Sequence, residues 1–201
     1  DFRMIHIFAD TTSSIPPPKA QELGLNYLPQ MIVFGEVTYR GDTEIDSPTF
    51  ISKLRSSAVL PKTAAPPPAL YTPAFEKLAV PGNTLIVITP SSDLSGTYRS
   101  AQVAAQDFPN ADIRIIDSRT IASGLAAIVL QALKWVEEGL DADTLEASIR
   151  SMCARSRTYF LVDTLEYLYK GGRIGGAQML VGSILQVKPI LTLRHGITQP
   201  V

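Results

Sequence analysis

Short runs of β-branched and other apolar residues alternate with longer stretches of helical pattern along most of this chain. The clearest run is Thr-Leu-Ile-Val-Ile-Thr at residues 84–89, which is apolar enough to be covered on both faces of a sheet. We expect a helix at residues 96–107 after it, then a strand at 113–116 and the longest helix at 121–138. Such an alternation is typical of βαβ units, in which a helix connects two parallel strands. The sequence therefore predicts an α/β fold whose N-terminal domain holds a parallel sheet.

Local signals predict the other elements. Residues 16–23 are expected to form a helix that begins with prolines and ends at Gly24. We expect Ser47 to cap a helix that extends to about Ser56, and Asp143 with Glu146 to form the capping box of a helix that ends near residue 156. The remaining expected elements are strands at residues 5–8, 26–34, 36–39 and 159–162 and a helix at 69–78.

The character of the sequence changes after Asp163. A glycine-rich segment at residues 171–176 is followed by an apolar stretch, expected to be helical to about residue 186, and by a hairpin at 188–201. We therefore divide the chain into an α/β domain at residues 1–163 and the start of a second, smaller α+β domain at 164–201. Because the chain stops in a strand with an unpaired edge, we expect this second domain to be incomplete.

Composition excludes several classes of function. The 18 basic and 19 acidic residues give a formal charge of −1, and no basic stripe stands out, so nucleic acid is not expected as a partner. No apolar run approaches the roughly 20 residues of a transmembrane segment. The chain has one cysteine, Cys153, and no pattern of a signal peptide. We therefore expect a cytoplasmic protein.

Hydroxyl-bearing residues gather where three expected strands end, at residues 10–14, 89–97 and 117–120. In an open α/β sheet the carboxyl ends of parallel strands meet in one crevice, and the helices that follow direct backbone N–H groups towards it. Serine, threonine and aspartate are also the ordinary helix caps, so a single cluster indicates little. Three clusters together favour an anion site lined by hydroxyl groups. The candidate binding residues are Ser13, Ser92, Ser95, Gly96 and Ser118, with Thr63 from a neighbouring loop.

The patterns expected of catalysis are missing from the sequence. There is no G-x-S-x-G elbow, no Walker pattern, no G-x-G-x-x-G after a strand and no cluster with metal-ligand spacing. Neither His6 nor His195 lies near a candidate serine in the sequence, and a serine without a base is a poor nucleophile. We therefore expect a binding protein without a catalytic residue, cofactor or metal. The alternative is a hydrolase or transferase of small acids or esters that uses the loop at residues 91–97.

Three segments resemble motifs of one family. Ser91-Ser92-Asp93-Leu94-Ser95-Gly96-Thr97-Tyr98 resembles the SS-x-LSGTY signature of the bacterial DegV family. Residues 10–13 are similar to its N-terminal aspartate-hydroxyl motif, and residues 165–174 to its L-x-Y-L-x-KGGRI motif. The likeness extends from Ile5 to Leu193 in the same order.

The resemblance implies the two-domain EDD fold with a long-chain fatty acid between the domains. The carboxylate of the acid would be held by Thr63 and Ser95. Some relatives present the bound acid to a fatty acid kinase for phospholipid synthesis, so such a kinase is a possible partner. The loop at residues 63–67 departs from the family pattern, because it keeps the threonine and a proline but lacks the serines and the glutamine.

The acyl chain needs a long apolar slot, since each buried methylene contributes about 0.8 kcal/mol. Met179, Leu180 and Ile184 are the candidate residues of this slot, although core packing is the default role of such a stripe. Arg173 is a further candidate, for contact with a phosphorylated head group or with a partner. Its ordinary role would be that of an exposed or backbone-capping arginine.

Overall fold

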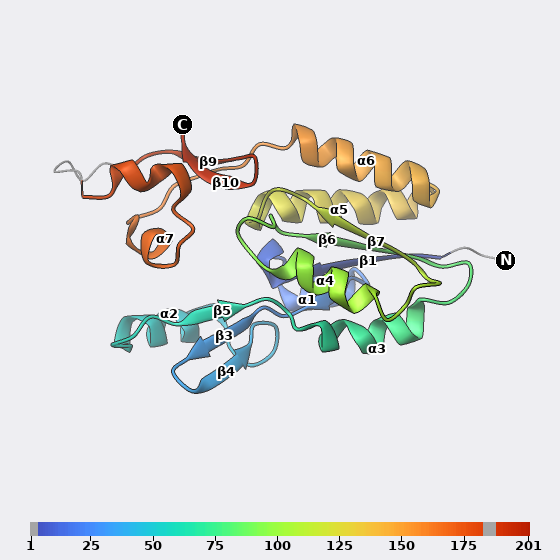
Figure 1. The fold of residues 1–201 in the computed structure, drawn as a ribbon, viewed down its shortest axis with the longest axis horizontal. Helices are drawn as coiled ribbons and strands as arrows, with labels where there is room; N and C mark the ends of the chain where they lie inside the picture. Colours follow the sequence, from blue (N-terminus) through green and yellow to red (C-terminus); the bar gives the residue numbers. More distant parts are fainter. Residues whose placement is uncertain (1–3, 183–187) are drawn as a thin grey trace.

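A parallel sheet of four strands forms the centre of the computed structural model, which describes residues 4–182 and 188–201. The strand order is β2-β1-β6-β7, where β1 is Ile5–Asp10, β2 is Asn26–Leu28, β6 is Thr84–Thr89 and β7 is Asp112–Asp117. All three pairings are parallel. The predicted α/β fold with a parallel sheet is therefore confirmed (Figure 1).

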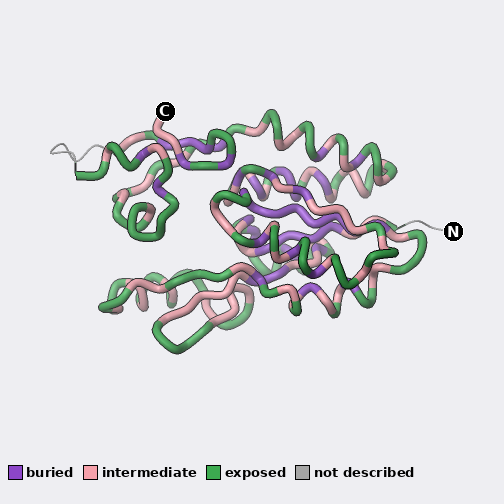
Figure 2. The backbone as a smooth tube through the Cα atoms, viewed as in Figure 1, coloured by how far each residue is buried: buried purple, intermediate pink, exposed green. Residues whose placement is uncertain are grey.

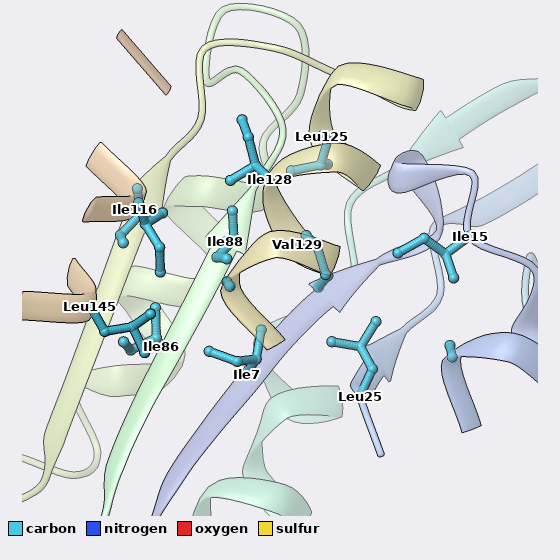
Figure 3. Packing of buried hydrophobic residues seen from close by; sticks show 14 residues of the cluster. Ile7, Ile15, Leu25, Ile86, Ile88, Ile116, Leu125, Ile128, Val129 and Leu145 are labelled. Atoms are coloured by element: carbon cyan, nitrogen blue, oxygen red, sulfur yellow. The ribbon is translucent and has the colours of Figure 1, made fainter. Parts of the chain in front are cut away.

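Helices cover both faces of this sheet. α5 (Ala122–Glu137) and α6 (Ala142–Arg155) lie on one face, and α3 (Pro68–Leu78) and α4 (Thr97–Ala105) on the other (Figure 1). Alternate residues of β6 serve the two faces: Ile86 and Ile88 pack with α5 and α6, while Leu85 and Val87 pack with α3 and α4. Every residue of β6 is buried, as the apolar run predicts. Figure 2 shows the buried backbone concentrated in this sheet, and Figure 3 the packing on the α5 face.

Two small antiparallel sheets flank the parallel one. The first has the order β4-β3-β5, formed by Met31–Phe34 (β3), Val37–Arg40 (β4) and Lys62–Ala64 (β5), with α2 (Ser47–Ser56) beside it. The second has the order β10-β9-β8, formed by Tyr159–Phe160 (β8), Leu191–Arg194 (β9) and Ile197–Pro200 (β10). The predicted C-terminal hairpin is confirmed as β9 and β10. The shorter elements are α1 (Pro17–Glu22), α7 (Glu166–Lys170) and the 3-10 helices η1 (Thr11–Ser13) and η2 (Gly175–Leu180).

Both predicted helix caps are displaced. Asp46, not Ser47, caps α2, because its carboxylate accepts the N–H of Thr49 at 2.8 Å. Asp141 caps α6 by accepting two backbone N–H groups. The predicted capping-box residues Asp143 and Glu146 instead bind the guanidinium of Arg114, at 2.7 and 3.1 Å. In each case an aspartate N-terminal to the expected cap supplies the carboxylate, which accepts the orphan N–H groups well.

Two predicted elements are shorter than expected. The strand expected at residues 26–34 is divided into β2 and β3 at Pro29, which has no N–H to donate to a ladder. The apolar helix expected to extend to about residue 186 is wrong at Val181 and Gly182, because Val181 is extended and Gly182 has a φ of +80°. Residues 183–187 lie outside the described part. β8 pairs with β9, so the second sheet already begins before the expected domain boundary at Asp163.

Within residues 4–182 and 188–201, no helix is both long and apolar enough to cross a membrane.

Candidate functional site

A cavity of about 450 Å³ opens beside the carboxyl ends of β1 and β6, where the hydroxyl clusters lie. We call it the hydroxyl-lined cavity. Its lining joins three of the predicted site residues, Thr63, Ser95 and Arg173, which come from β5, the loop before α4 and the segment after α7. Among the described residues, the lining consists of Thr12, Gln30, Thr63, Leu94, Ser95, Ile121, Ala122, Ser123, Thr158, Phe160, Leu168, Arg173, Leu193 and Thr198. The volume is within the range of about 300–1,000 Å³ of small-ligand sites.

Ser95 is fixed by the first residue of α4. Its Oγ lies 2.8 Å from Oγ1 of Thr97 and accepts the backbone N–H of Thr97 at 3.3 Å. Gly96, between the two, does not line the cavity, but a Cβ on it would lie 3.8 Å from the Cβ of Ala65. This close approach places the end of β5, and with it the exposed Thr63, beside the Ser95 loop. Thr63 and Ser95 therefore face one cavity from two neighbouring segments.

A buried carboxyl group lies behind Ser95. Asp10, at the end of β1, is 1% exposed and accepts hydrogen bonds from the N–H of Thr12 at 2.8 Å and from Nε2 of Gln30 at 3.2 Å. Burial raises the pKa of Asp10, and these neighbouring groups oppose the shift. Nε2 of Gln30 also donates to Oγ1 of Thr97 at 2.9 Å. Hydrogen bonds thus connect Asp10 to Ser95 through Gln30 and Thr97.

Arg173 connects the segment between β8 and β9 to the loop that carries Ser95. Its Nε donates to the carbonyl oxygen of Leu94 at 3.2 Å, and one terminal nitrogen donates to that of Gly171 at 2.6 Å. Both partners are neutral, so these contacts position the guanidinium without cancelling its charge. The turn that carries Arg173 continues through Gly175, whose φ of +52° is costly for any residue with a side chain. A positive charge is thereby placed next to Ser95.

A second cavity, of about 1040 Å³, adjoins the first; we call it the outer cavity. The two share Thr63, Leu168 and Arg173. Apolar side chains of α2 and of the segment after it line one side of the outer cavity, and residues of the segment around α7 line the other. These lining residues include Phe50, Leu54, Val59, Leu60, Val162 and Tyr167. An elongated ligand in the first cavity could therefore extend into the second.

The other predicted site residues lie away from the hydroxyl-lined cavity. Ser13 is buried beside the hydroxyl of Tyr27 and accepts the N–H of Ile15, and Ser118 is buried and donates to the carbonyl oxygen of Thr120. Both serve the local backbone. Ser92 is exposed and accepts a hydrogen bond from Arg119 at 3.1 Å.

Two of the three predicted slot residues line neither cavity. Met179 is 80% exposed, and neither it nor Leu180 lines the hydroxyl-lined or the outer cavity. Ile184 lies outside the described residues.

Sequence reasoning missed several residues of the cavity wall. Thr12 stands in the first hydroxyl cluster and could have been named. Its Oγ1 is buried, and within the described part of the chain it has no hydrogen-bond partner of good geometry. It nevertheless lies close enough to Asp10 to lower the pKa of that carboxyl. Gln30 carries no local signal, since it simply follows Pro29 in the connection before β3. Thr158 reaches the wall through tertiary contacts, with its Oγ1 2.8 Å from that of Thr120. Such contacts appear only once the sheets are assembled.

The histidines lie elsewhere. His6 is in β1, where its Nε2 is 3.3 Å from the side-chain nitrogen of Asn83. His195 lines a third cavity of about 680 Å³ together with four arginines, Arg119, Arg150, Arg157 and Arg194. The residue beside the Ser95 hydroxyl is thus a threonine, not a base. Among the described residues no group of His, Cys, Asp and Glu is arranged to hold a metal ion.

Comparison with known proteins adds independent observations. A family model described as "Uncharacterised protein, DegV family" matches residues 4–201. A DegV domain-containing protein of Halalkalibacterium halodurans is 36% identical over 197 residues, which cover 98% of this chain and 70% of the relative. The fold of this chain is similar to that of a DegV family protein from Thermus thermophilus, whose structure concerns fatty acid binding. The two are 31% identical with a TM-score of 0.90, and the match covers 98% of this chain and 70% of the other. DegV of Bacillus subtilis, described as a fatty acid binding protein, gives 30% identity, a TM-score of 0.85 and coverage of 99% and 71%.

Proposed function

Because this chain belongs to the DegV family, we propose that it binds a long-chain fatty acid through the carboxylate, in the hydroxyl-lined cavity. The observation that carries the proposal is the meeting of Thr63, Ser95 and Arg173 on one cavity whose exposed surface is otherwise mostly apolar. The fatty-acid-binding DegV proteins of Thermus thermophilus and Bacillus subtilis support it, since each is at least 30% identical to this chain.

The head-group end of the cavity suits a carboxylate. The hydroxyls of Thr63 and Ser95 can each donate one hydrogen bond, and hydrogen bonds to an ionised acceptor are stronger than those between neutral groups. Arg173 adds a positive charge at the same place, held by Leu94 and Gly171. Together these groups lower the pKa of a bound carboxyl and keep it ionised. Ser13, Ser92, Gly96 and Ser118 do not line this cavity, and we propose no contact between them and the ligand.

The remainder of the cavity suits an acyl chain. Apolar side chains from the loop before α4 and from the α5, β8, α7 and β9 regions face it. These are Leu94, Ile121, Ala122, Phe160, Leu168 and Leu193. Each methylene that leaves water for such a surface contributes about 0.8 kcal/mol, so chain length dominates affinity. The part of a long chain that the first cavity cannot hold extends into the outer cavity. A role for Met179, Leu180 and Ile184 in the slot stays a prediction.

We also propose that the protein is a carrier and not an enzyme, and that it presents the acid to a fatty acid kinase for phospholipid synthesis. In support of the carrier, the neighbour of the Ser95 hydroxyl is Thr97, and neither hydroxyl is a base. Thr63 and Arg173 are exposed, so the head group would lie at an edge that a partner can reach. A cytoplasmic location is part of this proposal.

Native mass spectrometry with organic extraction of the purified chain tests the binding proposal. The expected result is a complex whose extra mass equals that of a long-chain acid recovered in the extract. An empty protein that takes up no palmitic acid but hydrolyses a small test ester contradicts it and favours the hydrolase. The kinase proposal has a separate test, in which the loaded chain, ATP and a fatty acid kinase are mixed and the acyl phosphate is trapped with hydroxylamine. Absence of the hydroxamate with a kinase that phosphorylates acid on another DegV protein contradicts it.

A further inference from the structure

In the chain of hydrogen bonds behind Ser95, Asp10 determines which group donates and which accepts at each step. Oδ1 of Asp10 accepts the backbone N–H of Thr12 at 2.8 Å and lies 3.2 Å from the side-chain amide of Gln30. A carboxylate oxygen can only accept, so the amide atom that faces it is the nitrogen of Gln30. Asp10 therefore fixes which way round the amide of Gln30 is held.

Because its nitrogen is fixed in this way, Gln30 also acts as a hydrogen-bond donor to Thr97. Its Nε2 has two hydrogens, and the second is donated to Oγ1 of Thr97 at 2.9 Å. Thr97 is 0% exposed, and among the described residues Oγ of Ser95, at 2.8 Å, is the only hydrogen-bond acceptor within reach of its hydroxyl hydrogen. If Ser95 donated to Thr97 instead, that hydrogen would be buried without an acceptor, which is costly. Thr97 therefore donates to Ser95.

The oxygen of Ser95 then accepts two hydrogen bonds, from the hydroxyl and from the backbone N–H of Thr97. Its own hydrogen has no partner in this network and is left for the hydroxyl-lined cavity, which Ser95 lines. We propose that Asp10, Gln30 and Thr97 make Ser95 an obligate hydrogen-bond donor to the ligand, with Gln30 as the positioning residue that sets the direction. The site thereby selects ligands that present an acceptor and disfavours those that offer a donor. This inference rests on the proposed function, since the acceptor in question is the acid's carboxylate.

The variant Gln30→Glu reverses the direction. It replaces the nitrogen that faces both Asp10 and Thr97 by an oxygen. The two adjacent carboxyl groups then share one proton, which lies between residue 30 and Asp10. Thr97 therefore donates to residue 30, Ser95 donates to Thr97, and Ser95 offers only lone pairs to the cavity. The probes are methyl palmitate, which only accepts, and 1-hexadecanol, which can also donate. Both are uncharged, so repulsion from the new carboxylate does not affect them. The control Gln30→Met removes the amide without introducing an acceptor.

Affinities are measured by displacement of a fluorescent fatty acid from the 201-residue chain. We expect the ratio of ester affinity to alcohol affinity to fall about fivefold in Gln30→Glu, the equivalent of one neutral hydrogen bond, and to fall less in Gln30→Met. A ratio in Gln30→Glu equal to that of the wild type, in a wild type that binds palmitic acid, overturns the inference and leaves the proposed function standing. A wild type that binds no palmitic acid overturns the proposed function.

Neutron diffraction from crystals of the deuterated wild-type protein keeps the inference testable if Gln30→Glu does not fold. The expected result is a deuterium bonded to Oγ1 of Thr97 and directed at Oγ of Ser95. A deuterium bonded to Ser95 and directed at Thr97 overturns the inference.

Discussion

Replacement of Ser95 by alanine removes one hydroxyl from the hydroxyl-lined cavity and leaves the remainder of its wall in place. The bound carboxylate loses one hydrogen bond to a charged group, which we expect to cost about 1–2 kcal/mol of binding free energy. This corresponds to an increase of about 5- to 30-fold in the Kd of a long-chain acid. The acyl chain keeps its contacts, so the loss in free energy should be the same for acids of different length.

The same change has a predictable effect on folding. Thr97 is fully buried and loses the acceptor of its hydroxyl hydrogen, which costs about 1–3 kcal/mol unless water enters from the cavity. For a chain of this size, each 1 kcal/mol lowers Tm by about 2–4 °C. Where no water enters, the penalty on Thr97 is the same with and without ligand, and it then does not enter the change in Kd.

The assay is displacement of a fluorescent fatty acid, with circular dichroism to establish that the variant is folded. Ser92→Ala is the matched control, because Ser92 is a serine of the same loop that is exposed and bonded to Arg119. We expect no change in Kd for this control. An unchanged Kd in folded Ser95→Ala, or an equal loss in Ser92→Ala, refutes the assignment of Ser95 to the head group.

Three further predictions follow from other contacts. Thr63→Val should raise the Kd of a long-chain acid as Ser95→Ala does. If both hydroxyls bind one carboxylate, the change in binding free energy of the double variant should differ from the sum of the two single changes in the same displacement assay. A strictly additive change contradicts binding of one carboxylate by both residues. Gly175→Ala should lower Tm by more than Gly24→Ala does. Both glycines have positive φ, but only at Gly175 would a Cβ collide with the backbone of β10, and this collision should cost about 1–3 kcal/mol more of unfolding free energy, the usual cost of overpacking. Equal Tm values for the two variants contradict this. Burial raises the pKa of Cys153 to about 11, so its alkylation by iodoacetamide should be slow at pH 8 and should still accelerate above pH 9; a plateau below pH 9 contradicts the burial of this thiol.

The parallel sheet could be predicted because its signal is local and strong. The run at residues 84–89 has the length and apolarity of a strand covered on both faces, and β6 is such a strand. The caps of α2 and α6 were misplaced because several aspartates, serines and threonines stand near each helix start and all of them can cap. Only the assembled structure shows that Arg114 binds Asp143 and Glu146.

The head-group site could be predicted in part for the same reason. Ser95 belongs to a conspicuous hydroxyl cluster, whereas Gln30 acquires its role from Asp10 and Thr97, which are 20 and 67 residues away. The apolar stretch after residue 176 predicted a helix from its composition, but the backbone at Val181 and Gly182 does not continue one. Long-range contacts and glycine conformations of this kind have no signature in a single sequence.

The central claim is that the acid is held by its carboxylate at Ser95, Thr63 and Arg173, and ¹³C NMR of bound palmitic acid labelled at the carboxyl carbon tests it most directly. The account predicts a single bound resonance that stays at the ionised position as the pH falls through the ordinary carboxylic-acid range, because hydrogen bonds to the charged form lower its pKa. It also predicts that the resonance moves in Ser95→Ala and does not move in Ser92→Ala. A bound carboxyl that titrates at or above the ordinary range, and whose resonance is the same in Ser95→Ala as in the wild type, would contradict the account.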